Sequence, residues 1–266
     1  TYNARYPAVA YNSTNNEYLV VWSGDDNVGG LVNGEYEIFG QRLDAETGST
    51  VGANDFRISD MGGIGDPDYA AENPDVEYNG TLNEYLVAWV GDDNIGGLVH
   101  GEQEVFVQRL DAATGQQLGY NDLGISDMGG IGDPIYDAWN LAVAYNSTDD
   151  RYLVVWTGDD NVGGLVDEER EIFGELLDAA TLWPLAPNDF RISDMGGTGD
   201  PDFGVNQPSV CYNNVGNQFL VVWWGDDNVG GLVDMEYEIF GQRLDAIDGG
   251  QVGANDFRIS DMGGTG

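Results

Sequence analysis

Short runs of apolar residues alternate along the chain with loops of glycine, aspartate and asparagine. Residues 8–11 form a short β-prone run, and a polar turn closes it at residues 12–16. Residues 17–22 read Glu-Tyr-Leu-Val-Val-Trp, an apolar run without alternation, which predicts a strand buried on both faces. Two further strands are predicted over residues 35–44 and 54–59. No window carries a helical stripe, and the glycine spacing would break one, so the chain is predicted to be all-β.

This pattern recurs every 67 residues without insertions or deletions. The tetrapeptide Gly-Asp-Asp-Asn places its first aspartate at Asp25, Asp92, Asp159 and Asp226. We therefore treat 1–266 as one repeat domain with units of about 1–65, 66–132, 133–199 and 200–266. Gly266 aligns with Gly65, so the chain begins almost where it ends in repeat phase. A closed ring is expected to show this, although a fragment cut from a longer array would look the same.

Four antiparallel strands per unit, apolar on both faces and repeated in tandem, are typical of a β-propeller blade. The segments Tyr-Leu-Val-Val-Trp and Ile-Phe-Gly-Gln-Arg-Leu-Asp resemble the repeats of bacterial secreted β-propellers, and calcium-loop propellers of the integrin-α type are a looser resemblance. The resemblance spans all four copies and implies a four-bladed propeller, a blade count shared with hemopexin-type propellers. A β-solenoid and a longer array of paired sheets are the alternatives.

The charge of the chain limits its partners. It has 47 acidic and 9 basic residues, a net charge of −38, so nucleic acids and anionic membranes are poor partners. The single cysteine, Cys211, excludes an intrachain disulfide. We see no signal peptide and no apolar run of membrane-spanning length. An extracellular or cell-surface location is therefore inferred from the acidity and the repeat type alone.

The first acidic loop of each repeat is predicted to bind calcium. It reads Gly-Asp-Asp-Asn-(Val/Ile)-Gly-Gly-Leu-Val and continues into Glu-x-Glu. Calcium takes six to eight oxygen ligands on a flexible frame, and the chain repeats no histidine or cysteine that would suit a softer metal. A solvated acidic rim built from Asx turns is the alternative. The predicted ligands are Asp25, Asp26, Asn27, Glu35, Glu37, Asp92, Asp93, Asn94, Glu102, Glu104, Asp159, Asp160, Asn161, Glu169, Glu171, Asp226, Asp227, Asn228, Glu236 and Glu238.

A second loop, Ser-Asp-Met-Gly-Gly-(Ile/Thr)-Gly-Asp-Pro, has fewer carboxylates and a proline at its exit. A tight turn between blades and a second calcium site are both open here. Its methionine is interpreted as a packing residue. Asp55, beside Asn54, is interpreted as a cap and not as a site residue. The acids of this loop are Asp60, Asp66, Asp127, Asp133, Asp194, Asp200 and Asp261.

Catalytic residues in a repeat protein should stand out as departures from the repeat. The departures are few: His100, Cys211 and the aromatics Trp139, Trp183 and Trp224. The chain has no Ser/His/Asp set and no phosphate loop, and its paired carboxylates recur in every copy. No enzyme activity is therefore predicted.

The predicted function is that of a non-enzymatic, extracellular structural or adhesive protein. Calcium would stiffen its loops and bridge copies of the chain or other surface proteins. The alternative is a lectin-like propeller that binds glycans with the help of calcium. Tyr36 aligns with Gln103 and Arg170, so the loops repeat no exposed aromatic, and this favours the structural reading.

Overall fold

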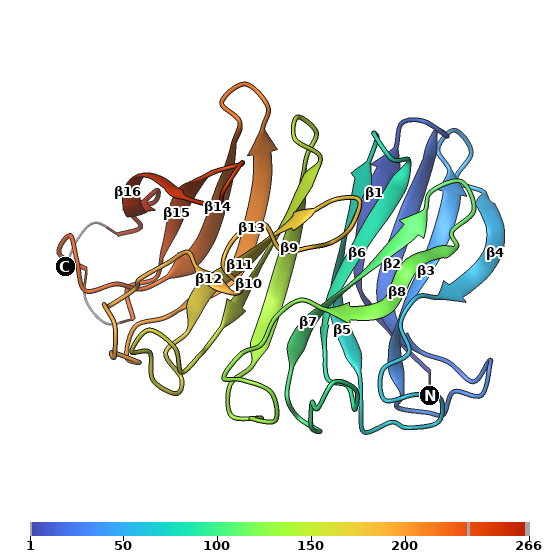
Figure 1. Cartoon of the computed structure of the whole chain (residues 1–266), viewed down its shortest axis with the longest axis horizontal. Helices are drawn as coiled ribbons and strands as arrows, with labels where there is room; N and C mark the ends of the chain where they lie inside the picture. Colours follow the sequence, from blue (N-terminus) through green and yellow to red (C-terminus); the bar gives the residue numbers. More distant parts are fainter. Residues whose placement is uncertain (1, 233–234, 264–266) are drawn as a thin grey trace. The chain divides into compact units, whose positions relative to one another are not determined.

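The structure is a computed structural model that describes residues 2–232 and 235–263, and Figure 1 shows its course. The predicted domain limits at residues 1 and 266 lie outside the described residues. The described chain contains strands and turns and no helix, so no helix in it is long and apolar enough to cross a membrane. The all-β prediction is confirmed.

Sixteen strands form four sheets of four antiparallel strands, and each sheet is one repeat. The first repeat contains β1 (Ala4–Asn12), β2 (Glu17–Asp25), β3 (Tyr36–Asp44) and β4 (Thr50–Arg57). The second contains β5 (Ala71–Asn79), β6 (Glu84–Gly91), β7 (Glu104–Asp111) and β8 (Gln117–Gly124). The third contains β9 (Ala138–Asn146), β10 (Arg151–Gly158), β11 (Glu171–Asp178) and β12 (Phe190–Arg191). The fourth contains β13 (Val205–Asn213), β14 (Gln218–Gly225), β15 (Glu238–Asp245) and β16 (Gln251–Arg258).

The fourth strand of each repeat differs most from its prediction. It begins at Thr50 rather than at residue 54, and its register shifts opposite Gly40 to Arg42. In the third repeat this strand shrinks to the two residues of β12. The segment before β12 contains Pro184 and Pro187 where the first repeat has Thr50 and Ala53. Proline has no N–H to donate to a ladder, which explains the short strand.

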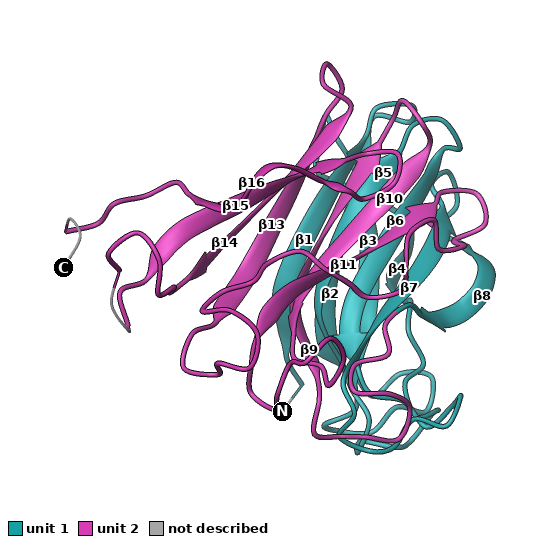
Figure 2. Cartoon of the chain, turned by 60° about the vertical axis from the view of Figure 1, so that its left-hand side comes forward, with its two compact units in different colours: residues 1–125 teal, residues 126–266 magenta. Residues whose placement is uncertain are grey.

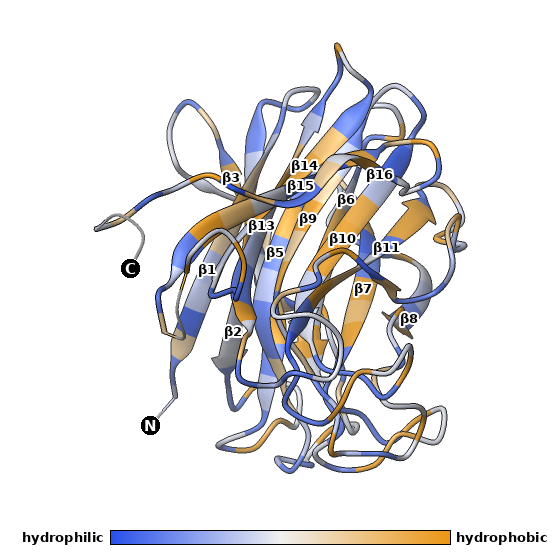
Figure 3. Ribbon diagram, turned by 90° about the vertical axis from the view of Figure 1, so that its left-hand side faces the viewer, coloured by the Kyte–Doolittle hydropathy of each residue, from blue (hydrophilic) through white to orange (hydrophobic). Residues whose placement is uncertain are grey.

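The chain divides into two compact units, residues 1–125 and 126–266 (Figure 2). In unit 1 the first repeat packs on the second through β1, β2 and β3 against β5. In unit 2 the third repeat packs on the fourth through β9, β10 and β11 against β13. Figure 3 shows apolar residues concentrated along β10 and β14, the second strands of the two repeats in unit 2.

Burial of the second strand depends on the repeat. In β6 and β10 every residue after the first is buried, as the continuous apolar run predicts. Most of β2 and all of β14 instead alternate between buried and half-buried or exposed positions. The indoles at the shared position follow this contrast only in part, because Trp89, Trp156 and Trp223 are buried whereas Trp22 is half-buried. Continuous burial of the second strand is therefore found in the second and third repeats.

Candidate functional site

Two carboxylates of the first acidic loop hold the backbone of the loop itself. Asp92 accepts the amide of Ala70 at 2.9 Å with one oxygen and that of Gly101 at 3.0 Å with the other. Glu35 accepts Val32 N–H and Gly65 N–H, both at 2.8 Å. The equivalent carboxylates of the other repeats accept backbone amides at the same places. They are Asp25, Asp159, Asp226, Glu102 and Glu169. These residues give the glycine-rich loop the hydrogen-bond partners that its backbone requires.

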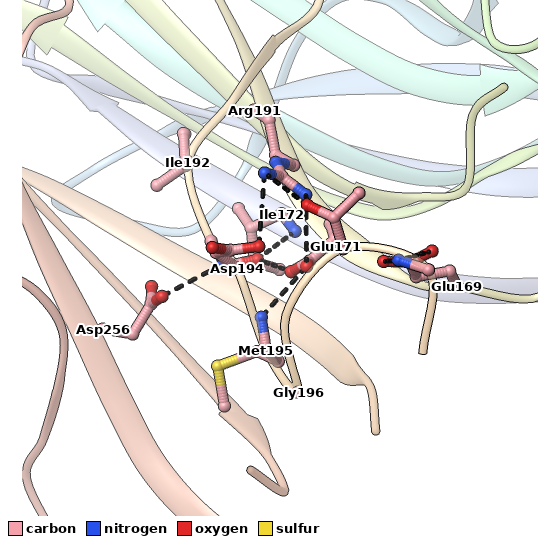
Figure 4. Close-up of polar contacts among 12 residues, drawn as sticks. Glu169, Glu171, Ile172, Arg191, Ile192, Asp194, Met195, Gly196 and Asp256 are labelled. Atoms are coloured by element: carbon pink, nitrogen blue, oxygen red, sulfur yellow. Dashed lines mark hydrogen bonds and ion pairs between the residues drawn. The ribbon is translucent and has the colours of Figure 1, made fainter. Parts of the chain in front are cut away.

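A third carboxylate of this loop ties the first acidic loop to the second. Glu171 accepts the hydroxyl of Ser193 and the backbone N–H of Met195 at 3.0 Å, and the Arg191 guanidinium lies 3.8 Å away (Figure 4). Glu37 makes the same contacts with Ser59 and Met61. Burial raises the pKa of both carboxyls to about 8, although the hydrogen bonds from these donors act to lower it. These side chains therefore serve as internal anchors of the second loop.

The asparagine of the first loop and the aspartates of the second loop also form hydrogen bonds or ion pairs within the chain. Asn94 donates its side-chain amide to the Gly62 carbonyl at 2.8 Å, and Asn161 and Asn228 repeat the contact in unit 2. Asp60, Asp194 and Asp261 pair with the arginine three residues before them. Asp66, Asp133 and Asp200 each accept the N–H two residues on, which marks a turn.

The calcium prediction stays a prediction. In the described part of the chain, no three His, Cys, Asp or Glu side chains form a group that could hold a metal ion. Because most loop carboxylates accept backbone amides, a bound cation would rely on the oxygens that remain. The second aspartate of the loop supplies one of these. Asp93 is 2% exposed, and its Oδ2 atom is buried without a hydrogen-bond partner.

Calcium at about 1 mM is expected to raise the melting temperature of the chain, and a chelator to lower it, if Asp93 and its equivalents hold the ion. Differential scanning calorimetry measures this shift. Magnesium at equal ionic strength is the control, since any divalent cation screens a charge of −38. Equal shifts with both ions would contradict a calcium site.

A pocket in unit 2 brings together residues at which the four repeats differ. Trp224 aligns with Ser23, Val90 and Thr157, and it is half-buried at the wall of the pocket. The pocket holds about 230 Å³. Its lining residues are Glu168, Arg170, Pro201, Asp202, Gly204, Val205, Asn206, Trp224, Asp226 and Tyr237.

Aromatic and charged side chains share this pocket. The Trp224 and Tyr237 rings meet edge to face with centroids 5.2 Å apart, and Tyr237 is 53% exposed. The Trp224 indole N–H donates to Gln207 at 3.1 Å, which fixes the ring. Arg170 pairs with Glu168 at 3.0 Å and lies over the Trp139 ring at 4.8 Å. The pocket therefore offers flat apolar faces beside acidic and basic hydrogen-bonding groups.

The aligned positions in unit 1 carry different side chains. Arg5 pairs with Glu72 and lies 4.0 Å from the centroid of the Tyr36 ring. Glu72 and Arg5 stand where Asn206 and Trp139 stand in unit 2. Sequence reasoning noted the aromatic departures Trp139 and Trp224 but could not place them together, because their positions lie far apart along the repeat.

No family model and no curated protein matches the chain. Solved structures match it at low sequence identity. An N-acetylgalactosamine deacetylase from F. plautii, in complex with a blood group B trisaccharide, has a TM-score of 0.53 at 14% identity, over 94% of this chain and 69% of that one. The Hadza microbial sialidase Hz136 has a TM-score of 0.57 at 10% identity, over 97% and 47%. An exo-β-1,3-galactanase from Clostridium thermocellum has 0.52 at 12%, over 96% and 48%.

These matches show the fold. The neighbours are β-propellers, so the prediction of a propeller built from four-stranded repeats is confirmed. The resemblance to calcium-loop propellers of the integrin type finds no support among them. The chain spans about half the length of the sialidase and the galactanase.

Two predictions made from the sequence are wrong. The chain was expected to be a non-enzymatic structural or adhesive protein, and no enzyme activity was expected. The three solved structures named above, which share its fold, are carbohydrate-active enzymes: a deacetylase, a sialidase and a galactanase. The physical reason for the error lies in the repeats. Strand and loop residues recur in every copy, and the few departures, such as Trp139 and Trp224, carry no chemical signature that the sequence alone could assign to an enzyme.

Proposed function

We propose that this chain is a carbohydrate-active propeller that contacts glycans at the pocket lined by Trp224 and Tyr237. The observation that carries the proposal is the pairing of the half-buried Trp224 ring and the exposed Tyr237 ring with carboxylates in one pocket. The C–H face of a sugar ring packs on an aromatic ring, and its hydroxyls hydrogen-bond to acidic and amide groups. The fold neighbours include a deacetylase in complex with a blood group B trisaccharide and an exo-β-1,3-galactanase, which agrees with this class of ligand.

The proposal includes glycan processing as well as binding. Glycoside hydrolysis needs two carboxyl groups beside the scissile bond. The pocket is lined by three, but Asp226 accepts Gly204 N–H at 3.1 Å and Met235 N–H at 3.0 Å and is committed to the backbone. Glu168 and Asp202 are exposed and lie at the surface of the pocket. They are the pair that we assign to chemistry on a bound glycan.

Trp224→Thr is expected to weaken glycan binding by at least roughly tenfold, because it removes the stacking face. Threonine is the residue of the third repeat at this strand position, Thr157, so the fold should tolerate it. A glycan array followed by calorimetry with the strongest ligand measures the change. Trp183→Gln is the matched control, because Trp183 is 73% exposed and lies outside the pocket lining. Equal affinity in wild type and Trp224→Thr would remove the pocket from the proposal.

Glu168 offers a clean test of processing. It stands at φ +69°, where the first two repeats have Gly34 and Gly101, so Glu168→Gly removes the carboxylate and relieves the backbone. Release of reducing sugar from an array-selected glycan is expected from the wild type and should fall by at least about a hundredfold in this variant. Binding without any product in the wild type would restrict the function to recognition.

A further inference from the structure

The pocket beside Trp224 carries an excess of negative charge. Three carboxylates line it, Glu168, Asp202 and Asp226, and among its described lining residues Arg170 is the one basic group. Three negative charges against one positive leave a formal charge of −2 at the pocket, in a chain that carries −38 as a whole. A ligand that enters this pocket therefore meets a potential that attracts cations and repels anions.

The positive charge of Arg170 already has partners inside unit 2. Its guanidinium pairs with Glu168 at 3.0 Å, and its Cζ lies 4.8 Å from the centroid of the Trp139 ring. The carboxylate of an acidic sugar would have to displace Glu168 from these donors and would enter a pocket of its own charge. Arg170 therefore does not make the pocket a site for acidic glycans.

The carboxylate of Asp202, in contrast, is available to a ligand. Asp202 is exposed, and its backbone N–H donates to Asp200 at 3.3 Å in a turn. Within the part of the chain that the structure describes, its carboxylate takes part in no hydrogen bond or ion pair. Asp226 differs, because it is 3% exposed and accepts two backbone amides, so it adds charge to the wall of the pocket rather than a ligand-binding group.

Aligned positions elsewhere in the chain pair an aromatic ring with a cation. In the first repeat Arg5 lies 4.0 Å from the centroid of the Tyr36 ring. In the third repeat the two residue types are exchanged, because Trp139 stands at the position of Arg5 and Arg170 at that of Tyr36. An aromatic face attracts a cation that lies within about 6 Å of its centroid, which explains why either order is stable.

The fourth repeat keeps the ring of this pair and lacks the cation. Tyr237 aligns with Tyr36, but Asn206 stands at the position of Arg5. Among the described residues no arginine lies over the Tyr237 ring, which is 53% exposed. Tyr237, Asn206 and Asp202 all line the pocket, and Trp224 meets Tyr237 at an interplanar angle of 79°. Two aromatic walls and an available carboxylate therefore share one pocket.

We propose that this pocket selects glycans that carry a free, protonated amino group, with the ammonium held between Asp202 and the face of Tyr237. The inference rests on the proposed function and names its substrate class, the amino sugars. The ligand supplies the cation that Arg5 supplies to Tyr36 in the first repeat. N-acetylation removes this charge, a neutral sugar lacks it, and an acidic sugar brings the opposite one.

Matched oligosaccharides test this inference on an array, followed by calorimetry at about pH 6, where an amino group of this kind is protonated. Tetramers of the glucose and galactose type are presented in four forms: with a free amine, an acetamide or a hydroxyl at C2, or with a carboxylate at C6. The amine form is expected to bind roughly tenfold more tightly than the hydroxyl form, because an exposed ion pair and a cation–π contact each contribute a factor of a few. The acidic form should bind most weakly. Raising NaCl from about 0.05 M to about 0.5 M should reduce the preference for the amine.

Asp202→Asn should lower the ratio of amine to hydroxyl affinity by at least roughly threefold, and Tyr237→Gln should do the same. Glutamine is the residue of the second repeat at that position, Gln103. Asp68→Asn is the matched control, because Asp68 aligns with Asp202, is also exposed and lies outside the pocket lining. It removes the same charge from the chain, so an equal loss of preference in this variant would overturn the assignment to Asp202.

The outcomes separate this inference from the proposed function. Binding of the hydroxyl or acidic form as tightly as the amine form would overturn the amino-sugar inference and leave a glycan-binding pocket. Binding of no glycan on the array would overturn both.

Discussion

Met195→Ala is expected to lower the free energy of unfolding of this chain by about 3 kcal/mol. Truncating a buried methionine costs about 2 to 5 kcal/mol, because its transfer free energy is lost and a cavity remains. Met195 is fully buried beside Trp223 and Phe240, and its backbone N–H is fixed by Glu171 at 3.0 Å. The backbone cannot move in to fill the space, so the cost should not fall to the low end of this range. Urea unfolding followed by tryptophan fluorescence measures it.

Met262→Ala is the control for this prediction. It is the same residue in the same loop of the fourth repeat, but it is 73% exposed. Its truncation should change the free energy of unfolding by less than about 0.5 kcal/mol. A loss at Met195 no larger than that at Met262 would mean that the loop does not hold neighbouring repeats together.

The strands could be predicted from the sequence because their cause is local. An apolar run such as residues 17–22, bounded by Asn-rich and Gly-rich turns, predicts a strand in any fold, and β2 covers it. The early start of β4 could not be predicted in this way. Thr50 and Val51 form a ladder with Leu43 and Arg42 across a bulge, and the pairing partner rather than the local sequence sets this boundary.

The role of the acidic residues was harder to predict, because a carboxylate has the same appearance in a sequence whether it binds a cation or a backbone amide. Asp92 and Glu35 accept two amides each, and such pairings depend on the path of the loop. Asp122 shows most clearly why the sequence alone does not reveal the partner of an acidic residue. Its equivalent Asp55 was interpreted as a cap, yet Asp122 accepts the amide of Asp60, 62 residues away. Contacts between repeats leave no mark on the sequence within one repeat.

A single buried carboxyl in the third repeat departs from the pattern in a way that affects stability. Glu175 replaces the glutamine found as Gln41, Gln108 and Gln242. Gln41 donates its amide to Arg42 O at 2.8 Å and accepts Asp55 N–H at 3.2 Å. Glu175 accepts Asp189 N–H at 3.2 Å, but its Oε1 is buried without a hydrogen-bond partner. Burial raises the pKa of Glu175 to about 8 from 4.5.

Glu175→Gln is therefore expected to stabilise the chain, and by an amount that grows with pH. Between pH 4.5 and about 8 the folded state keeps a proton on Glu175 that the unfolded state has lost, so stability of the wild type falls as pH rises through this window. Glutamine is neutral and can donate to the Leu176 carbonyl as Gln41 does to that of Arg42. The gain should be small near pH 4.5 and about 2 to 4 kcal/mol near pH 8. Urea unfolding at both pH values measures it, with Glu46→Gln, at an exposed position, expected to stay within about 0.5 kcal/mol at each. A gain that is equal at the two pH values would show that the missing amide, and not the buried charge, is what the third repeat lacks.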